Sequence, residues 1–147
     1  MQILYTADEK TGVYYERLVG KNVPIEEFQR HLLNPEHMHN AFQYKKIIVD
    51  FQNITLELDD QEAYSELFDN HIKILQETPS ATEKFAIVVS HTNELFFSSQ
   101  LKEQLDAVKG VRSKFFLKTE AVNAYMEVDV GKFFLINDVE LGKYSLS

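Results

Sequence analysis

Two apolar and aromatic runs open the chain, at residues 2–6 and 13–19. The polar stretch between them, ADEKTG, supplies the Asp, Lys and Gly that suit a short turn, and Gly20 follows the second run. This pattern predicts a β-hairpin at the start of the fold.

Helical spacing of apolar positions follows the hairpin. In NVPIEEFQRHLLNP, Asn22 can cap a helix, Pro24 fits its first turn, and Asn34 with Pro35 ends it. Asp59 and Glu62 have the spacing of a capping box for a second helix, which should run to about Glu77. A third helix should start at Glu94 or Ser98 and end at Gly110, and a fourth should be capped by Thr119 and include Met126.

Three further runs predict strands: Ile47–Phe51, Phe85–Val89 and Ser113–Leu117. The first two are apolar on both faces, which indicates the interior of a parallel sheet. Together with the helices they give the order β-β-α-β-α-β-α-β-α, an α/β domain with helices on a mostly parallel sheet. We expect the first hairpin strand to lie antiparallel at an edge, and 147 residues to form a single domain, 1–147.

The end of the chain, from Asp129 on, does not fit this alternation. Phe133–Ile136 is too apolar to be exposed to water, so it should be covered. Two alternatives remain: an added strand or helix on its own domain, or an arm exchanged across a homodimer through residues 132–141.

Four segments resemble a known group of proteins: GVYYERLVG, IIVDFQNI, KFAIVVSH and KFFLKTEAVNAYM. In layout and hydrophobic spacing, residues 2–128 are similar to the SpoIIAA-like group, which includes STAS domains and stand-alone STAS/CRAL-TRIO-like bacterial proteins of unknown function. The resemblance implies a right-handed β-α superhelix with a mixed, mostly parallel sheet of about five strands. Residues 129–147 would be a C-terminal extension of that core.

STAS antagonists of anti-sigma factors have an Asp-Ser-Ser-Gly-type motif after the strand that corresponds to Ile47–Phe51, and a partner kinase phosphorylates its serine. Here Asp50 matches, but FQNI follows without Ser or Gly, and the nearest hydroxyl belongs to Thr55. This departure argues against the phosphorylation switch, and phosphorylation of Thr55 is left open.

The carboxyl edge of the sheet is where open α/β folds usually bind ligands, and the loop at residues 50–60 should lie there. Ser90 and His91, with Asp50, invite a hydrolase hypothesis, but adjacent strand side chains face opposite ways and no GxSxG elbow is present. A short apolar run at residues 95–97 should cover the core or line a cleft. The candidate ligand or partner site therefore comprises Asp50, Asn53, Thr55, Ser90, His91, Leu95, Phe96 and Phe97.

Histidines are the other residues with chemical potential. His37 and His39 could project from one side of an extended segment, with His31 on the helix before it, but no Cys and no carboxylate is fixed beside them by spacing. We therefore interpret this segment as a polar connection, and His71 as a half-exposed helix residue. The five glycines are isolated, so no nucleotide-binding fingerprint is present. We expect no metal, no cofactor and no catalytic residue.

Charge and composition narrow the choice of partners. A formal net charge of -8 would repel nucleic acid and an anionic membrane surface. No apolar run approaches the ~18 residues of a spanning helix, so we expect no integral membrane segment. The absence of Cys is compatible with a reducing compartment, and the protein should be cytoplasmic.

The sequence favours a non-enzymatic binding or regulatory module of the STAS-like type, because catalytic and cofactor motifs are lacking on a fold used mainly for interactions. Its partner would be a protein or a small apolar ligand. The alternative is a carrier of a small apolar or lipid-like ligand, as the CRAL-TRIO side of the resemblance implies. A small hydrolase that uses Ser90, His91 and Asp50 is a third hypothesis.

Overall fold

The computed structural model describes residues 1–32, 34–57, 61–90, 99, 102–106 and 111–144, with Leu32 and residues 61–65 described by their backbone alone. These residues form a mixed sheet of six strands in the order β5-β4-β3-β2-β1-β6. The strands are β1 (Gln2–Asp8), β2 (Val13–Val23), β3 (Lys46–Leu56), β4 (Lys84–Val88), β5 (Arg112–Phe116) and β6 (Gly142–Lys143). The α/β fold is confirmed.

Strand directions agree with the predicted layout in the main. Strands β2 to β5 are parallel, and β1 pairs antiparallel with β2, as the hairpin requires. The prediction that β1 lies at an edge was wrong, because β6 pairs antiparallel with β1 at Leu4 and Tyr5. The C-terminal extension thus covers part of an edge that would otherwise expose unpaired backbone groups.

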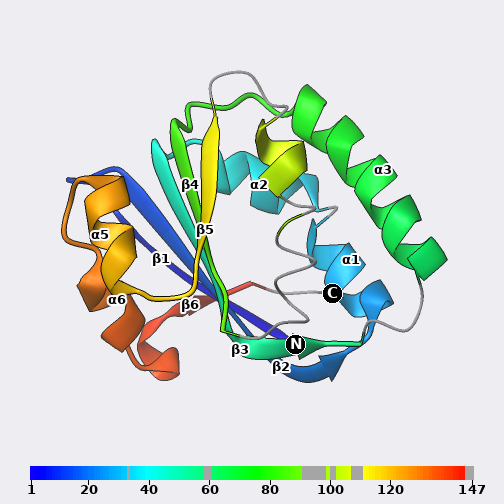
Figure 1. The fold of residues 1–147 in the computed structure, drawn as a ribbon, viewed down its shortest axis with the longest axis horizontal. Helices are drawn as coiled ribbons and strands as arrows, with labels where there is room; N and C mark the ends of the chain where they lie inside the picture. The colour runs from blue at the N-terminus through cyan, green and yellow to red at the C-terminus, as the bar shows by residue number, and fades with distance from the viewer. Residues whose placement is uncertain (33, 58–60, 91–98, 100–101, 107–110, 145–147) are drawn as a thin grey trace.

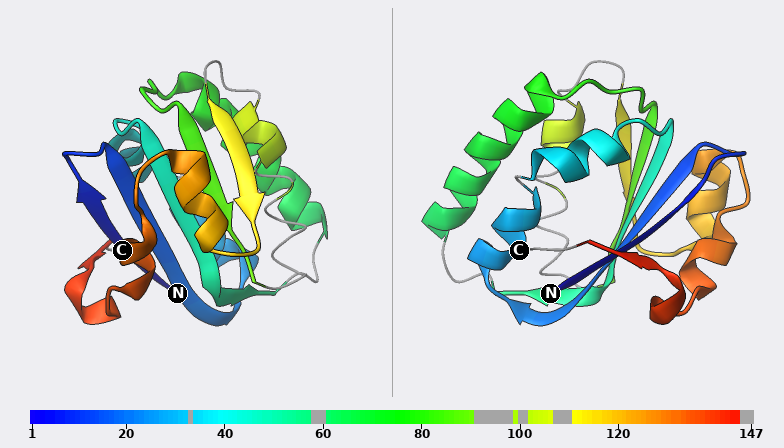
Figure 2. Two further views of the ribbon diagram at one scale, coloured as in Figure 1. Left: turned by 60° about the vertical axis from the view of Figure 1, so that its left-hand side comes forward. Right: turned by 180° about the vertical axis from the view of Figure 1, so that it is seen from behind.

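Helices cover both faces of the sheet (Figure 1). On one face lie α1 (Ile25–Leu32), α2 (Pro35–Ala41), α3 (Gln61–Glu77) and the helical residues 102–106. The opposite face holds α5 (Glu120–Met126) and α6 (Gly131–Leu135), followed by the short 3-10 helix η1 (Asp138–Glu140), as both views in Figure 2 show. Within the described residues, no helix has the length and apolar composition needed to cross a bilayer.

Strand β3 is longer than the sequence suggested. We expected a loop from Asp50, but β3 continues to Leu56 because β2 also continues past Gly20 to Val23. The two strands remain paired in parallel as far as Val23 and Leu56. A long neighbour satisfies the backbone donors and acceptors of the polar segment, which keeps it in the sheet.

The predicted helix before Asn34 is α1, and a second short helix, α2, follows it where a connection was expected. Asn22 belongs to β2 with a φ of 48°, so it is not the cap; the carbonyl oxygen of Pro24 accepts the first helical hydrogen bonds instead. Asn34 ends α1 and also caps α2, since its side chain accepts hydrogen bonds from the backbone N–H groups of Glu36 and His37. Residues 35–41, expected to be an extended connection, are therefore helical, with Pro35 at the first turn.

The remaining helices follow the prediction less completely. Helix α3 ends at Glu77 as predicted, but the capping box at Asp59 and Glu62 lies outside the residues whose side chains are described. The predicted start and end of the third helix also lie outside them. Thr119 precedes α5 but makes no side-chain cap hydrogen bond, because its own backbone is already helical (φ -65°, ψ -30°).

The C-terminal extension packs against its own sheet, which is the first of the two alternatives for residues 132–141. The ring of Phe133 stacks on that of Tyr15 with 5.5 Å between centroids, and the backbone N–H of Tyr144 donates to the carbonyl of Ile3. A homodimer through residues 132–141 remains a prediction.

Each face of the sheet has its own apolar core. Successive residues of β2 alternate between the two cores: Tyr14 and Leu18 face helices α1 to α3, whereas Tyr15 faces α5 and α6. This alternation decides which polar side chains of β2 can meet.

Candidate functional site

Strand β2 contains two charged residues in a segment that is buried on both faces. Glu16 is 2% exposed and Arg17 is 5% exposed. Because neighbouring strand residues point to opposite faces, the two charges enter different cores and do not neutralise one another. A buried charge is stable only when it is paired and hydrogen-bonded, so each must find its own partners.

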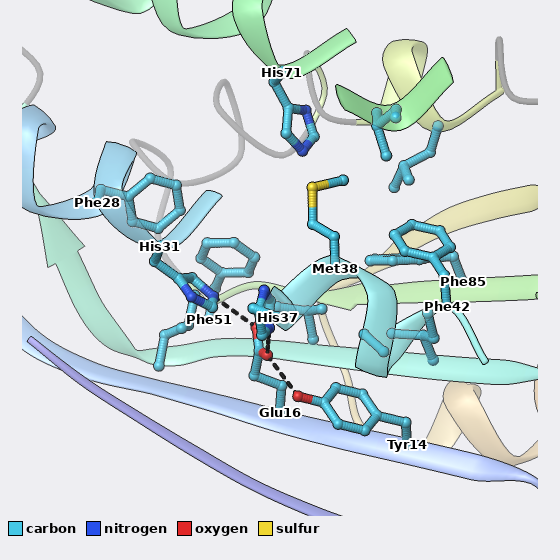
Figure 3. A pocket seen from close by; sticks show the side chains of 16 residues that line it. Tyr14, Glu16, Phe28, His31, His37, Met38, Phe42, Phe51, His71 and Phe85 are labelled. Carbon is cyan, nitrogen blue, oxygen red and sulfur yellow. Dashed lines mark hydrogen bonds and ion pairs between the residues drawn. The ribbon is translucent and has the colours of Figure 1, made fainter. Parts of the chain in front are cut away.

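Glu16 finds its partners in two histidines from helices α1 and α2. The Nε2 atom of His31 lies 3.0 Å from Oε2 of Glu16, and the Nε2 atom of His37 is hydrogen-bonded to Oε1 (Figure 3). The two imidazole rings are tilted by 50° with centroids 4.0 Å apart. One carboxylate therefore joins two histidines that come from different helices.

The break between α1 and α2 brings these histidines together. His31 lies in the last turn of α1 and His37 in the first turn of α2, and Asn34 stands between the helices. An uninterrupted helix would separate residues 31 and 37 by more than one and a half turns of 3.6 residues. The reversal at Asn34 and Pro35 is thus the local reason that both rings reach Glu16.

Two tyrosines extend the cluster along the sheet. The hydroxyl of Tyr14 donates to Oε1 of Glu16 at 2.9 Å, and it lies 2.9 Å from the hydroxyl of Tyr144 in the C-terminal extension. The ring of Tyr144 also meets that of His37 edge-on, with 5.0 Å between centroids. The end of the chain is therefore connected to the Glu16 cluster.

Burial and charge have opposite effects on the carboxyl group. Burial alone would raise the pKa of Glu16, but the positive charge that His37 and His31 can bear, and their hydrogen bonds, lower this pKa well below its usual range. Burial lowers the pKa of His31, and burial with the nearby Glu16 charge raises that of Tyr14. The cluster thus holds an ionised carboxylate beside a tyrosine hydroxyl that keeps its proton.

The cluster lies at one side of an apolar pocket with a cavity volume of about 60 Å³. Figure 3 shows Met38 and the rings of Phe28 and Phe51 close to the histidines. Among the described residues, the lining is apolar apart from Tyr14, Glu16 and three histidines: Leu18, Phe28, Met38, Ala41, Phe42, Ile47, Val49, Phe51, Leu75, Phe85 and Leu105.

The third histidine of the pocket is His71, which is buried rather than half-exposed as we expected. Its Nδ1 atom lies 2.7 Å from Oε1 of Gln104, whose amide nitrogen donates to the carbonyl of Phe68. That donation makes Oε1 the acceptor, so Nδ1 of His71 bears the proton and Nε2 has the lone pair. Burial lowers the pKa of His71 to about 4.

One nitrogen of the cluster is not accounted for. The Nδ1 atom of His37 is buried and has no hydrogen-bond partner among the residues that the structure describes. An unpaired buried acceptor or donor costs about 1–3 kcal/mol. This atom is a position at which a bound water or ligand would find an unused partner.

The residues predicted from the sequence do not gather in this pocket. Asp50 is buried on the opposite face of the sheet, where the hydroxyl of Tyr15 donates to its Oδ2 at 2.6 Å and the backbone N–H of Gln52 donates to its Oδ1. Arg17 joins the same network through its Nε, which donates to the Tyr15 hydroxyl at 3.1 Å. Asp50 is therefore part of a structural network beneath α6.

The other predicted residues lie apart from one another. Asn53 is exposed on β3, and Thr55 accepts a hydrogen bond from the backbone N–H of Asn22. Ser90 is exposed, and its hydroxyl donates to the carbonyl of Gln52 at 3.3 Å. His91, Leu95, Phe96 and Phe97 lie outside the described residues.

Sequence reasoning missed Glu16 and kept the histidines apart from any carboxylate. One signal was present: an adjacent Glu and Arg in the middle of an aromatic strand, GVYYERLVG, which would be costly without buried partners. A second was the pair His31 and His37 on either side of Asn-Pro. Neither signal says that the three side chains meet, because that depends on where α1 and α2 pack.

Comparisons of this chain with protein-family models, with curated proteins and with solved structures found no match.

Proposed function

We propose that this protein is a non-enzymatic binding module that holds a small ligand in the pocket between β2 and helices α1 and α2. The observation that supports this is the buried cluster of Glu16, His31 and His37 at the side of an otherwise apolar cavity. Ligand sites commonly combine an apolar lining with a few convergent polar groups. The polar part of the ligand would bind the cluster, and its remaining atoms would contact Met38 and Phe28.

The size of the cavity limits the ligand. About 60 Å³ is less than half of the ~150 Å³ apolar cavity that accepts benzene. The fitting ligand is therefore an ion with its water, or a molecule of a few heavy atoms, unless side chains move. Met38 is the residue best able to move, since an unbranched thioether adapts its shape easily.

A binding role also agrees with the hydrogen bonds of Asp50 and Ser90, the described residues that suggested catalysis. Both carboxylate oxygens of Asp50 accept hydrogen bonds within the fold, so this group is already in use as a structural anchor. The hydroxyl of Ser90 donates to a backbone carbonyl rather than to a base in the described part of the chain. These contacts disfavour the hydrolase hypothesis and support a module without turnover.

We also propose that the chain has the SpoIIAA-like arrangement of strands and helices. Parallel strands β2 to β5 with an antiparallel β1, and helices on both faces, are compatible with the superhelix. In the family switch a serine follows the strand that contains Asp50; here that segment continues as strand to Leu56, with Thr55 holding the backbone of Asn22. Ligand binding, rather than phosphorylation, would then be the regulatory input.

The alternative is a carrier of a small apolar or lipid-like ligand. The apolar lining of the pocket favours it, but a chain of more than a few carbons requires α1 or α2 to move away from the sheet. Native mass spectrometry of the purified protein separates the two proposals: a co-purifying lipid supports the carrier, and its absence supports the small-ligand module.

A binding screen tests the main proposal. The wild-type chain, with chelator present, is screened against small carboxylic acids, amines, alcohols and azoles by NMR of the histidine imidazoles. We expect binders that shift the signals of His31 and His37 and that leave the exposed His39 unchanged. Binders that instead shift only the amides of Asn53, Thr55 and Ser90, or ester or phosphate hydrolysis lost in Asp50→Asn, would contradict it.

A further inference from the structure

We infer that Glu16, His31 and His37 form a binding site for one divalent transition-metal ion of the zinc type. This inference rests on the proposed function, because it names the ligand class of the same pocket. One possible ligand atom from each residue lies within 4.8 Å of the other two. Two histidines and one carboxylate that converge in this way are a recurrent ligand set for Zn²⁺ and for non-haem iron.

The distances between the candidate ligand atoms are close to those between donor atoms that bind the same metal ion. Zinc bonds to imidazole nitrogen and carboxylate oxygen are about 2.0–2.2 Å long, so two donors on one ion are at most about 4.4 Å apart. The ligand atoms here lie within 4.8 Å of one another, and rotation of the side chains closes the difference. The ion would replace the two imidazole–carboxylate hydrogen bonds with three coordinate bonds.

The donor set selects the class of ion. Imidazole nitrogens suit Zn²⁺, Fe²⁺, Co²⁺, Ni²⁺ and Cu²⁺, whereas Mg²⁺ and Ca²⁺ prefer shells of oxygen atoms. Of the three candidate ligands, Glu16 alone supplies oxygen, and the nearby walls are Phe28, Phe51 and Met38. Three protein ligands leave the fourth position of a tetrahedral site for water or a small anion, and the cavity of about 60 Å³ has room for it.

The positions of the ligands are set by the fold rather than by a flexible loop. Glu16 lies in the central part of β2, and His31 and His37 lie in the turns that flank the capped break at Asn34. The hydroxyl of Tyr14 donates to Oε1 of Glu16, an outer contact of the kind that orients carboxylate ligands in metal sites. Ligands that are already in place lose little conformational entropy on binding.

Zinc titration of the full, untagged chain tests the inference. The protein is stripped with EDTA, exchanged into chelator-free buffer and titrated with Zn²⁺ in a calorimeter, with Mg²⁺ as the comparison ion. We expect one Zn²⁺ per chain, no response to Mg²⁺, and a Tm about 5 °C higher or more at a Zn²⁺ concentration 100 times the Kd.

Two variants locate the site. His37→Gln removes one ligand and should weaken Zn²⁺ binding by more than about 10-fold, the lower range of loss for outer-sphere changes alone. His39→Gln is the matched control, because His39 is exposed on the same helix and belongs to no ligand group in the described chain. It should leave the Zn²⁺ affinity unchanged. Unaltered binding by His37→Gln, or an equal loss in both variants, would overturn the inference.

A wild-type measurement keeps the test decisive if His37→Gln does not fold. Zn²⁺ should shift the imidazole signals of His31 and His37 but not those of His39, and Co²⁺ should give the visible absorption of a four- or five-coordinate site. Absence of both signals overturns the metal site. If the small-molecule screen nevertheless shifts His31 and His37, the binding module stands without the metal; if neither probe reaches the pocket, both proposals fail.

Discussion

The Nε2 atom of His31 lies 3.0 Å from the Oε2 atom of Glu16, although the two residues are 15 positions apart and both are buried. This contact joins the end of helix α1 to the middle of strand β2. It also replaces the water that the Glu16 carboxylate lost on folding. His37 and Tyr14 complete the set of partners, so the carboxylate links three side chains from three elements.

Glu16→Gln should destabilise the protein by about 2 kcal/mol in the presence of a chelator. The amide group keeps the shape of the side chain, but its NH₂ faces a donor and leaves a buried imidazole nitrogen without an acceptor, which costs about 1–3 kcal/mol. Urea denaturation measures the change. Glu140→Gln, at an exposed position of η1, is the control and should stay within about 0.5 kcal/mol of the wild type. Equal stability of both variants would mean that the carboxylate does not hold the histidines.

Arg17→Lys should loosen the C-terminal extension. The guanidinium donates from Nη1 to the carbonyl of Ile136 at 2.6 Å and to Asp138 at 2.7 Å, and from Nη2 to the carbonyl of Phe133 at 3.0 Å. An ammonium group cannot reproduce this fork. Hydrogen exchange should become faster in residues 131–144, with a loss of about 2 kcal/mol of stability.

The matched control for Arg17 is Arg30→Lys, on the exposed side of α1. It should leave hydrogen exchange of the extension unchanged. Wild-type protection of residues 131–144 in Arg17→Lys would show that the stacking of Phe133 on Tyr15 is sufficient to hold the segment.

Stability should fall between pH 6.5 and about 4 in part because of His71. Burial lowers the pKa of His71 to about 4, below its ordinary value of 6.5, so in this window the unfolded chain binds a proton that the folded chain does not. The contribution of His71 to the free energy of unfolding is complete above pH 6.5 and decreases as the pH falls. The total loss is about 3 kcal/mol over the whole window.

His71→Asn tests this contribution, because the Asn amide can donate to Gln104 from nearly the same place but does not titrate. Urea denaturation at several pH values should give a smaller loss of stability for this variant than for the wild type. Parallel pH profiles would assign the acid sensitivity to other groups.

A homodimer through residues 132–141 would use Leu135 and Val139, which are 84% and 93% exposed on the extension. Sedimentation of the wild type should then give twice the chain mass of 17.1 kDa. Leu135→Lys with Val139→Lys should give the monomer, whereas Leu117→Lys, at an exposed apolar residue after β5, should not. A monomeric wild type would refute the dimer, and single exposed apolar residues are common on monomers.

Local patterns gave most of the elements correctly. The runs at 47–51, 85–89 and 113–117 are strands to within one residue at their starts. The first two are apolar on both faces and so have few alternatives to a buried sheet. The same patterns wrongly predicted a loop where β3 continues from Asp50 to Leu56, and an extended connection where His37 lies in helix α2. The polar end of β3 stays in the sheet only because its neighbour β2 is equally long there, and local spacing does not reveal the length of a neighbour. After the break at Asn34 the chain can start a second helix as easily as a loop, and local spacing does not decide between them.

The sequence by itself determined an α/β fold with a mostly parallel sheet, because hydrophobic periodicity and chain order leave few other ways to bury this much apolar surface. Only the tertiary structure decided which polar residues meet. The side of β2 on which Glu16 lies, and the places of α1 and α2 over that side, bring Glu16 to His31 and His37, whereas Asp50 lies in the opposite core. The physical reason is that a buried charge must be paired and hydrogen-bonded, and its partners can come from any part of the chain that packs beside it.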